Sequence, residues 1–274
     1  MNPRMRTISD QRGSVDGIDT HWLEAPTDGG RAPALYVHGV PTGGWDWRPF
    51  LERTGGYAPD LPGFGASDKP ASFDYSIGGY ERWLRAFVDQ RGLDRFSVVV
   101  HDWGGIGIAL AQAMPERIER MAIVNAAPLL PGYRWHFIAR CWRTRVVGEL
   151  TMGFATKFAM RRSLNLANRE PMPDEFVDAV WEHFDHGTQR AILKLYRSGS
   201  SDVLAAAGTR LGELRCPALV VWGGRDPYLP TEFAQRYADA LGGPATARVV
   251  EDAGHWLWYD EPGVIDEIAG FLTA

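Results

Sequence analysis

The sequence predicts an α/β fold with a mostly parallel central sheet, flanking helices and an inserted all-helical cap. Three observations lead to this prediction. Apolar β-branched runs alternate with helical segments up to residue 127, helical periodicity alone continues over residues 128–211, and the alternation then returns. Such alternation is typical of parallel strands joined by crossover helices. We therefore assign residues 1–127 and 212–274 to one core domain and residues 128–211 to the cap.

The elements before the cap follow from local patterns. Residues 15–24 are expected to form strands, because the turn pair Asp16-Gly17 lies near their start. Tyr80, Trp83, Leu84, Phe87 and Val88 follow helical spacing and predict an amphipathic helix. The other expected elements are strands at 34–37, 57–59, 96–100 and 121–124, and helices at 47–53 and 106–113.

The cap and the closing part of the core have different patterns. The cap segment contains large apolar residues within helical stretches: Trp135, Phe137, Ile138, Trp142, Phe154, Phe158 and Trp181. A buried strand pattern resumes at residues 218–222. A helix at 233–241, a strand at 247–250 and a closing helix at 264–272 complete the expected core.

Composition narrows the class of protein. The net charge is −5 and no long basic run is present, so neither a nucleic acid nor a membrane surface is an expected partner. The first residues lack the apolar segment of a signal peptide, and no apolar run approaches the ~18 residues of a membrane span. We expect a cytoplasmic monomer or homodimer. Eleven tryptophans suggest a broad aromatic-lined surface or cavity.

Four predicted strands end in polar, glycine-rich turns, and these turns contain the candidate catalytic residues. The turns begin at His38, His101, Gly224 and Asp252. Because ligands bind beyond the carboxyl ends of parallel strands, all four turns are expected to meet at one rim of the sheet. The order Asp102, Asp226, His255 then matches a nucleophile, an acid and a histidine.

These motifs together resemble the α/β-hydrolase superfamily, in the branch with an aspartate nucleophile that includes epoxide hydrolases and haloalkane dehalogenases. The resemblance covers essentially the whole chain. The matching segments are His38-Gly-Val-Pro41, Asp60-Leu-Pro-Gly-Phe-Gly-Ala-Ser-Asp68, Val100-His-Asp-Trp-Gly-Gly105, Gly223-Gly-Arg-Asp226 and Gly254-His255. Their order along the chain makes the signal specific, since each motif alone would be weak.

The chemistry of Asp102 follows from its place on a strand-to-helix turn. The positive end of the next helix favours an ionised carboxylate, which can attack an sp3 carbon and form an ester. His255 would activate the water that hydrolyses this ester, and Asp226 would orient the imidazole. The resemblance implies that the N–H groups of Val40 and Trp103 stabilise the oxyanion. The alternative is that Asp102 only caps the helix.

No metal or organic cofactor is expected, because protein groups supply every catalytic function in this scheme. The expected substrate is a small apolar organic molecule, with water as the second reactant. By resemblance, His38 would support the oxyanion loop and His101 would pack beside Asp102, so neither is given a proton-transfer role.

Cap residues should distinguish an epoxide from an alkyl halide, since only an opening epoxide needs a proton donor. Tyr196, which precedes Arg197, resembles the second cap tyrosine of epoxide hydrolases, and Tyr133 is the only tyrosine available earlier in the cap. We predict an epoxide hydrolase that uses both.

Other residues favour the alternative, a haloalkane dehalogenase. By resemblance, Trp103 matches a halide-binding position, although epoxide hydrolases often have tryptophan there too. The segments 41–48 and 67–70 resemble dehalogenases, but Val40 stands where many dehalogenases have asparagine. Trp103, Trp135 and Trp142 are the expected substrate-binding tryptophans. A third interpretation is a non-catalytic ligand-binding protein of the same fold.

Overall fold

The computed structural model describes residues 5–274, and its centre is a single eight-stranded sheet with the strand order β1-β2-β4-β3-β5-β6-β7-β8. β1 and β2 pair antiparallel, as do β2 and β4, and every later pair is parallel. The strands are β1 (Ser9–Val15), β2 (Ile18–Ala25), β3 (Ala34–Val37), β4 (Gly56–Pro59), β5 (Phe96–Asp102), β6 (Ile118–Ala126), β7 (Ala218–Gly223) and β8 (Ala245–Val250).

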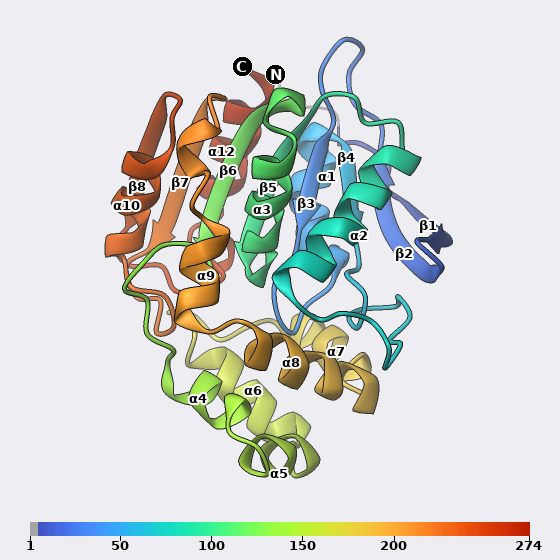
Figure 1. Cartoon of the computed structure of the whole chain (residues 1–274), viewed down its shortest axis with the longest axis vertical. Helices are drawn as coiled ribbons and strands as arrows, with labels where there is room; N and C mark the ends of the chain where they lie inside the picture. Colours follow the sequence, from blue (N-terminus) through green and yellow to red (C-terminus); the bar gives the residue numbers. More distant parts are fainter. Residues whose placement is uncertain (1–4) are drawn as a thin grey trace.

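Helices cover both faces of the sheet, as Figure 1 shows. The core helices are α1 (Arg48–Thr54), α2 (Ile77–Gln90), α3 (Ile106–Ala113), α10 (Glu232–Ala240), α11 (Leu257–Asp260) and α12 (Gly263–Thr273). Short 3-10 helices are η1 (Gly44–Trp47), η2 (Trp103–Gly105), η3 (Pro115–Arg117) and η4 (Leu211–Glu213). The expected helix at 47–53 is therefore a 3-10 turn followed by α1.

The central strands are buried on both faces, which explains their continuous apolar sequence. In β5, Val98 and Val100 belong to the apolar cluster shared with α2, α3 and α10, whereas Val99 belongs to the cluster shared with α1 and α12. Successive side chains of a strand point to opposite faces, so one strand contributes to both cores. The register aligns Val37 of β3 with Val100, and Val124 of β6 with His101. The carboxyl ends of three central strands therefore lie at one level.

The segment between β6 and β7 forms the helices α4 (Phe137–Arg143), α5 (Val147–Gly153), α6 (Lys157–Asn165), α7 (Asp174–Glu182), α8 (His186–Ser198) and α9 (Ser201–Ala207). In Figure 1, α4 to α8 form a layer below the carboxyl ends of the strands, while α9 lies beside the sheet. The Gln112 amide on α3 donates to the carbonyl of Ala207, 2.8 Å away, and so ties α9 to the core. Of the helices between β6 and β7, α9 therefore contacts the core.

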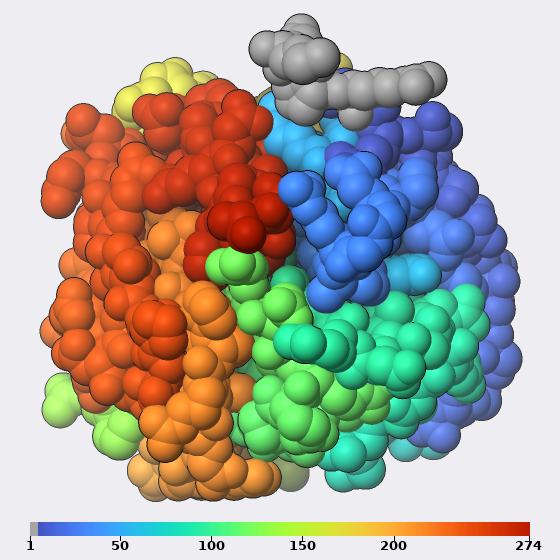
Figure 2. Space-filling view, turned by 90° about the horizontal axis from the view of Figure 1, so that it is seen from above, coloured from blue at the N-terminus to red at the C-terminus, as the bar shows by residue number. Residues whose placement is uncertain are grey.

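The end of the molecule opposite the cap brings the first and last parts of the chain together. Figure 2 views this face, where the red C-terminal residues meet blue N-terminal ones. α1 packs on α12, and Arg53 forms an ion pair with Asp266. The expected fold class is confirmed by this arrangement of sheet and helices. Within residues 5–274, the structure contains no helix whose length and apolar character would let it cross a membrane.

Candidate active site

Asp102 lies at the end of β5 on a sharp turn into α3. Its backbone has φ 50° and ψ −127°, a left-handed conformation that is strained for a residue with a Cβ atom. The turn also requires a glycine at position 104, because a Cβ there would lie 2.0 Å from the carbonyl oxygen of Val37. This strand–turn–helix geometry presents the Asp102 side chain at the rim of the sheet.

The Asp102 carboxylate is held by the loop that follows β3. The N–H of Val40 donates to Asp102 Oδ1 over 2.8 Å, and the Asp102 side chain makes no capping hydrogen bond to η2 within the described chain. Asp102 therefore does not act as a helix cap. Burial raises its pKa, although His255 and the N–H groups of Val40 and Trp103 oppose this rise by favouring the charged form.

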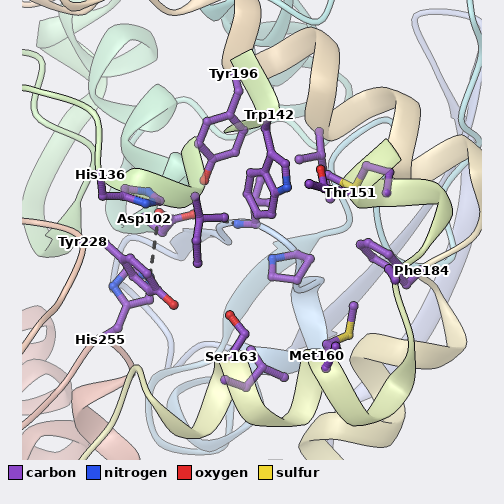
Figure 3. A pocket seen from close by; sticks show the side chains of 18 of the residues that line it. Asp102, His136, Trp142, Thr151, Met160, Ser163, Phe184, Tyr196, Tyr228 and His255 are labelled. Atoms are coloured by element: carbon purple, nitrogen blue, oxygen red, sulfur yellow. Dashed lines mark hydrogen bonds and ion pairs between the residues drawn. The ribbon is translucent and has the colours of Figure 1, made fainter. Parts of the chain in front are cut away.

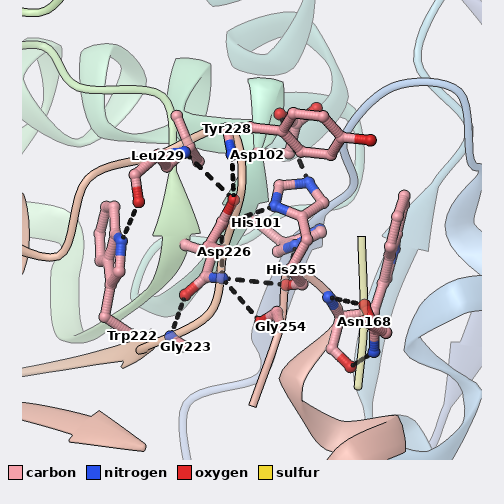
Figure 4. Close-up of polar contacts among 12 residues, drawn as sticks. His101, Asp102, Asn168, Trp222, Gly223, Asp226, Tyr228, Leu229, Gly254 and His255 are labelled. Atoms are coloured by element: carbon pink, nitrogen blue, oxygen red, sulfur yellow. Dashed lines mark hydrogen bonds and ion pairs between the residues drawn. The ribbon is translucent and has the colours of Figure 1, made fainter. Parts of the chain in front are cut away.

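His255 and Asp226 form a buried pair beside Asp102 (Figure 4). His255 Nδ1 lies 2.8 Å from Asp226 Oδ2, and His255 Nε2 lies 3.8 Å from Asp102 Oδ2. Asp226 Oδ1 accepts from the N–H groups of Tyr228 and Leu229 at 2.7 and 3.1 Å. Burial lowers the pKa of His255, but Asp226 and then Asp102 outweigh this effect, so the pKa is raised overall. The imidazole is thus oriented with Nε2 towards Asp102.

Asn125 holds this pair together, and nothing in the sequence analysis singled it out. Its amide donates to Asp226 Oδ2 over 2.7 Å and to the carbonyls of Gly254 and His255 over 3.1 Å, while its Oδ1 accepts from the N–H of Gly223. Asn125 directly follows the predicted strand at 121–124, and a polar side chain at the carboxyl end of a strand could have indicated a site residue. Like Asp102, Asn125 has a positive φ, 36°, which is uncommon for a residue other than glycine.

The two other histidines of the rim have structural contacts. His101 Nε2 lies 3.0 Å from the carbonyl of His255, and burial keeps its pKa well below the usual range. His38 Nε2 accepts from the N–H of Leu61 over 2.9 Å, and its Nδ1 lies 2.8 Å from the carbonyl of Gly39. Both rings thus bond to backbone groups of the loops at the rim.

A cavity of about 300 Å³ lies between this rim and the cap. Asp102 and His255 are at one end, as Figure 3 shows, and most of the wall is apolar. The lining residues from the cap include Trp142, Thr151, Met152, Phe154, Met160, Ser163, Phe184 and Tyr196. The volume is at the lower end of the range for small-molecule sites, which suits a small apolar ligand.

Tyr196 on α8 brings a hydroxyl group into this cavity. Its side chain is buried, and Figure 3 shows the hydroxyl directed towards Asp102. Burial raises its pKa well above the usual value, so the group stays a hydrogen-bond donor, while the neighbouring Trp103 indole opposes part of the rise. The tyrosine ring packs edge-on against Trp103 and Trp142, with centroid distances of 5.1 and 4.9 Å.

Trp103 and Trp135 lie behind Tyr196 rather than in the cavity wall. The two indole rings stack with a centroid distance of 5.3 Å, and neither is among the lining residues in the described chain. Trp135 Nε1 donates to the carbonyl of Gly199 over 2.9 Å. Trp103 is 1% exposed, and its Nε1 has no hydrogen-bond partner within residues 5–274. Of the three expected substrate-binding tryptophans, only Trp142 lines the cavity.

Tyr133 also lies outside the cavity wall. Its ring packs against Trp135 and against Phe233 of α10, at centroid distances of 5.0 and 5.8 Å. Its hydroxyl is 3.4 Å from the carbonyl of Tyr228. The structure therefore does not place Tyr133 beside Tyr196 as a second cavity hydroxyl, because contacts with the core hold its ring outside the cavity.

His136 lines the cavity and was missed by the sequence analysis. Its Nδ1 accepts from the N–H of Ala139 over 3.3 Å, so the proton of the neutral ring is on Nε2. Burial lowers its pKa to about 4, which keeps the ring neutral at pH 7. The ring lies 6.5 Å from that of Tyr196 and 4.8 Å from that of Tyr228, which also lines the cavity. His136 thus adds an N–H donor near Tyr196.

Metal ligands are not gathered at this site. Across residues 5–274, no group of three or more histidine, cysteine, aspartate or glutamate side chains has an arrangement that could hold a metal ion. The polar groups near Asp102 are instead the donors and acceptors described above.

Comparisons with known proteins agree with this architecture. A model described as the alpha/beta hydrolase family matches residues 34–267. A haloalkane dehalogenase from Psychrobacter cryohalolentis is 34% identical over 283 aligned residues, which cover 95% of this chain and 88% of that protein. Epoxide hydrolase 1 from Caenorhabditis elegans is 25% identical over 93% of this chain and 68% of its own length.

Solved structures show the same fold. The haloalkane dehalogenase DbeA from Bradyrhizobium elkani superposes with a TM-score of 0.83 at 23% identity, over 97% of this chain and 98% of that one. At this identity the likeness concerns the fold alone.

Proposed function

This chain belongs to the alpha/beta hydrolase family and is a hydrolase of its dehalogenase and epoxide hydrolase-like group, and we propose that it is an epoxide hydrolase. The substrate would be an apolar epoxide that fits a cavity of about 300 Å³, and the product would be the vicinal diol. The proposed reaction has two steps, alkylation of Asp102 and hydrolysis of the resulting ester.

The observation that carries the proposal is the position of the Tyr196 hydroxyl. It lines the cavity and is directed towards Asp102, so it can donate to an oxygen atom on the substrate carbon that Asp102 attacks. An epoxide oxygen becomes a basic alkoxide as the ring opens and benefits from such a donor. His136 Nε2–H is proposed as the second donor, in place of the expected Tyr133.

In the first step, Asp102 Oδ2 attacks an epoxide carbon and forms a C–O ester bond, because Oδ1 is already bonded to the Val40 N–H. The bond between that carbon and the ring oxygen breaks, and its electron pair stays on the oxygen. This oxygen takes the proton of Tyr196 and becomes the first hydroxyl of the product.

In the second step, His255 Nε2 takes a proton from water, and the water oxygen attacks the carbonyl carbon of the Asp102 ester. The N–H groups of Val40 and Trp103 stabilise the oxyanion. As it collapses, the bond between the Asp102 carbonyl carbon and the substrate oxygen breaks. That oxygen takes the proton still carried by the attacking water oxygen, which releases the diol and restores the Asp102 carboxylate. The His255 proton returns to the tyrosinate of Tyr196. Since the ionised Asp102 contributes to the raised pKa of His255, esterification removes that contribution and favours the neutral base when it is needed.

A haloalkane dehalogenase is the second candidate, because the 34% identical relative has that name. A departing halide would need N–H donors in the cavity. The indole Nε1 of Trp103 is one candidate, but Tyr196 packs against this ring and Trp103 is almost fully buried. The Trp103 indole is therefore not in the cavity wall, whereas Tyr196 is, and Trp142 is the expected tryptophan that does line the cavity.

A parallel assay on styrene oxide and 1-bromobutane tests the proposal directly. We expect diol formation from styrene oxide and little bromide release. The reverse preference would make the chain a dehalogenase, and neither activity, with intact folding, would favour a ligand-binding role.

The covalent step has its own test. A single turnover in H2-18O should place the label in the Asp102 carboxylate, because water attacks the ester carbonyl rather than the substrate carbon. Label that appears first in the diol would exclude the covalent mechanism.

A further inference from the structure

The outer part of the cap carries an unusual charge. Residues 128–169 contain eight arginine and lysine residues and a single acidic residue, Glu149, although the whole chain has a net charge of −5. Glu149 is paired with Arg197, and Lys157 and Arg161 are paired with aspartates of α7. Four exposed arginines in this segment make no ion pair with residues 5–274: Arg134, Arg140, Arg145 and Arg162. These four charges are available to an external partner.

The same segment exposes most of the large apolar side chains on the surface. Nine such side chains are exposed in residues 5–274, and seven of them are here: Phe137, Val146, Val147, Leu150, Phe154, Phe158 and Leu166. Phe154 and Phe158 are 79% and 77% exposed. A concentration of exposed apolar residues on a small region marks an interaction surface more often than isolated ones do.

Apolar and basic residues lie on the same helix faces. On α6 and its end, Phe158, Arg162 and Leu166 are spaced by four residues and form one exposed row. On α5 and its end, Val147, Leu150 and Phe154 form another row at helical spacing. On α4, the exposed Phe137 and Arg140 are three residues apart. Figure 1 shows α4, α5 and α6 together in the layer farthest from the sheet. We call this surface the cap face.

The cavity wall includes residues of the cap face. Thr151, Phe154 and Ala159 line the cavity and are also exposed to solvent. Since Asp102 is at the other end of the same cavity, a molecule that enters past α5 and α6 would reach it without leaving an apolar environment.

We propose that the cap face binds the surface of an anionic lipid membrane. Exposed phenylalanine and leucine side chains on short helices, bordered by arginine, match the composition of interfacial helices, which insert apolar groups between headgroups and place cations near lipid phosphates. A second copy of this chain is a less suitable partner for the cap face. In a symmetric dimer, the four unpaired arginines of one copy would face the same four arginines of the other, and these like charges would repel. No membrane partner is expected from the sequence, because its basic residues form no long run along the chain; folding brings these arginines together on one surface.

The consequence for catalysis rests on the proposed function. Apolar epoxides partition into lipid, so docking would place the cavity entrance where the substrate is concentrated. The docking itself does not depend on turnover and can be measured without it.

Vesicle binding by the full chain tests the proposal. Co-sedimentation would compare vesicles of phosphatidylcholine with vesicles that also contain phosphatidylserine, at low and physiological ionic strength. We expect binding to the anionic vesicles, weakened by salt. Arg140→Gln with Arg162→Gln should lower the partition coefficient about 25-fold, since each basic residue near an anionic surface contributes about fivefold. Leu150→Ser with Phe158→Ser should lower it by about tenfold or more.

The matched control replaces two exposed arginines at the opposite end of the sheet, Arg31→Gln with Arg95→Gln, and removes the same charge. This control should bind anionic vesicles within about twofold of the wild type. Equal binding to both vesicle types, or an equal loss in the control, would overturn the proposal. The proposal would also be overturned if the wild type bound no vesicles and sedimented as a dimer, and if the Leu150→Ser, Phe158→Ser variant sedimented as a monomer. Binding without turnover of vesicle-dissolved styrene oxide would support docking and count against the proposed function instead.

Discussion

Replacing Tyr196 with phenylalanine gives the sharpest test of the proposed proton donor. The substitution removes one hydroxyl group and keeps the ring that packs against Trp103, Trp135 and Trp142 at centroid distances of 5.1, 5.2 and 4.9 Å. A hydrogen bond of one neutral side chain contributes about 1 kcal/mol, so we expect the free energy of unfolding to change by about that much or less. Any large loss of activity would therefore report on chemistry.

The magnitude follows from the role of the group. General acid catalysis contributes about 10²–10⁴-fold, which corresponds to about 3–5 kcal/mol of transition-state stabilisation. His136 Nε2–H remains in the variant as a donor, so we expect a loss near the lower end, about 10²-fold in the rate of Asp102 alkylation. Because burial raises the pKa of Tyr196 well above 10, the wild-type rate should show no loss from tyrosine ionisation below pH 10.

The assay is rapid mixing of enzyme with styrene oxide under single-turnover conditions, with alkylation followed through the intrinsic fluorescence and product formation measured separately. Tyr228→Phe is the matched control, because Tyr228 also lines the cavity but is not assigned the donor role. We expect that control to keep the alkylation rate within about threefold. If Tyr196→Phe reduces alkylation by less than about threefold, or no more than Tyr228→Phe does, the assignment of Tyr196 is wrong.

Three further predictions follow from the buried polar groups. His255→Gln should accumulate the Asp102 ester, detected by intact-protein mass spectrometry as an increase equal to the substrate mass; no increase would refute the role of His255 in hydrolysing the ester. Asn125→Ala should destabilise the fold by about 1–3 kcal/mol in urea unfolding, because the N–H of Gly223 loses its acceptor, and should also slow ester hydrolysis; an unchanged hydrolysis rate would remove its positioning role. Burial raises the pKa of Asp46 to about 7, so the folded state keeps the Asp46 proton, and the stability of the wild type falls as pH rises towards 7. The free energy of unfolding of Asp46→Asn relative to wild type should therefore increase by about 3 kcal/mol between pH 4.5 and 7.5. A difference that does not change with pH would contradict this.

The core and the catalytic rim could be predicted because their signals are local. The buried runs of β5 and β7 read as strands in the sequence, and each is followed by glycine-rich turns with a polar side chain at a defined position. Since all parallel strands of a sheet point their carboxyl ends to the same edge, it was enough to recognise the turns in order to bring Asp102, Asp226 and His255 together. Their distances in the structure agree with that expectation.

The cap could not be predicted to the same depth, because the directions of its side chains depend on distant contacts. Tyr133 and Trp135 are close in sequence to His136, yet their rings pack on Phe233 and Trp103, while His136 lines the cavity. No periodicity distinguishes these neighbours, since the segment before α4 is not part of a helix.

The sequence by itself thus determined that Asp102 lies on a strand-to-helix turn. Which cap side chains line the cavity beside its carboxylate was decided only by tertiary structure. The physical reason is that the turn is fixed by glycines and strand pairing within a few residues, whereas the cavity wall forms where helices from the cap meet the rim. Packing there places Tyr196, and not the Trp103 ring behind it, in the cavity wall.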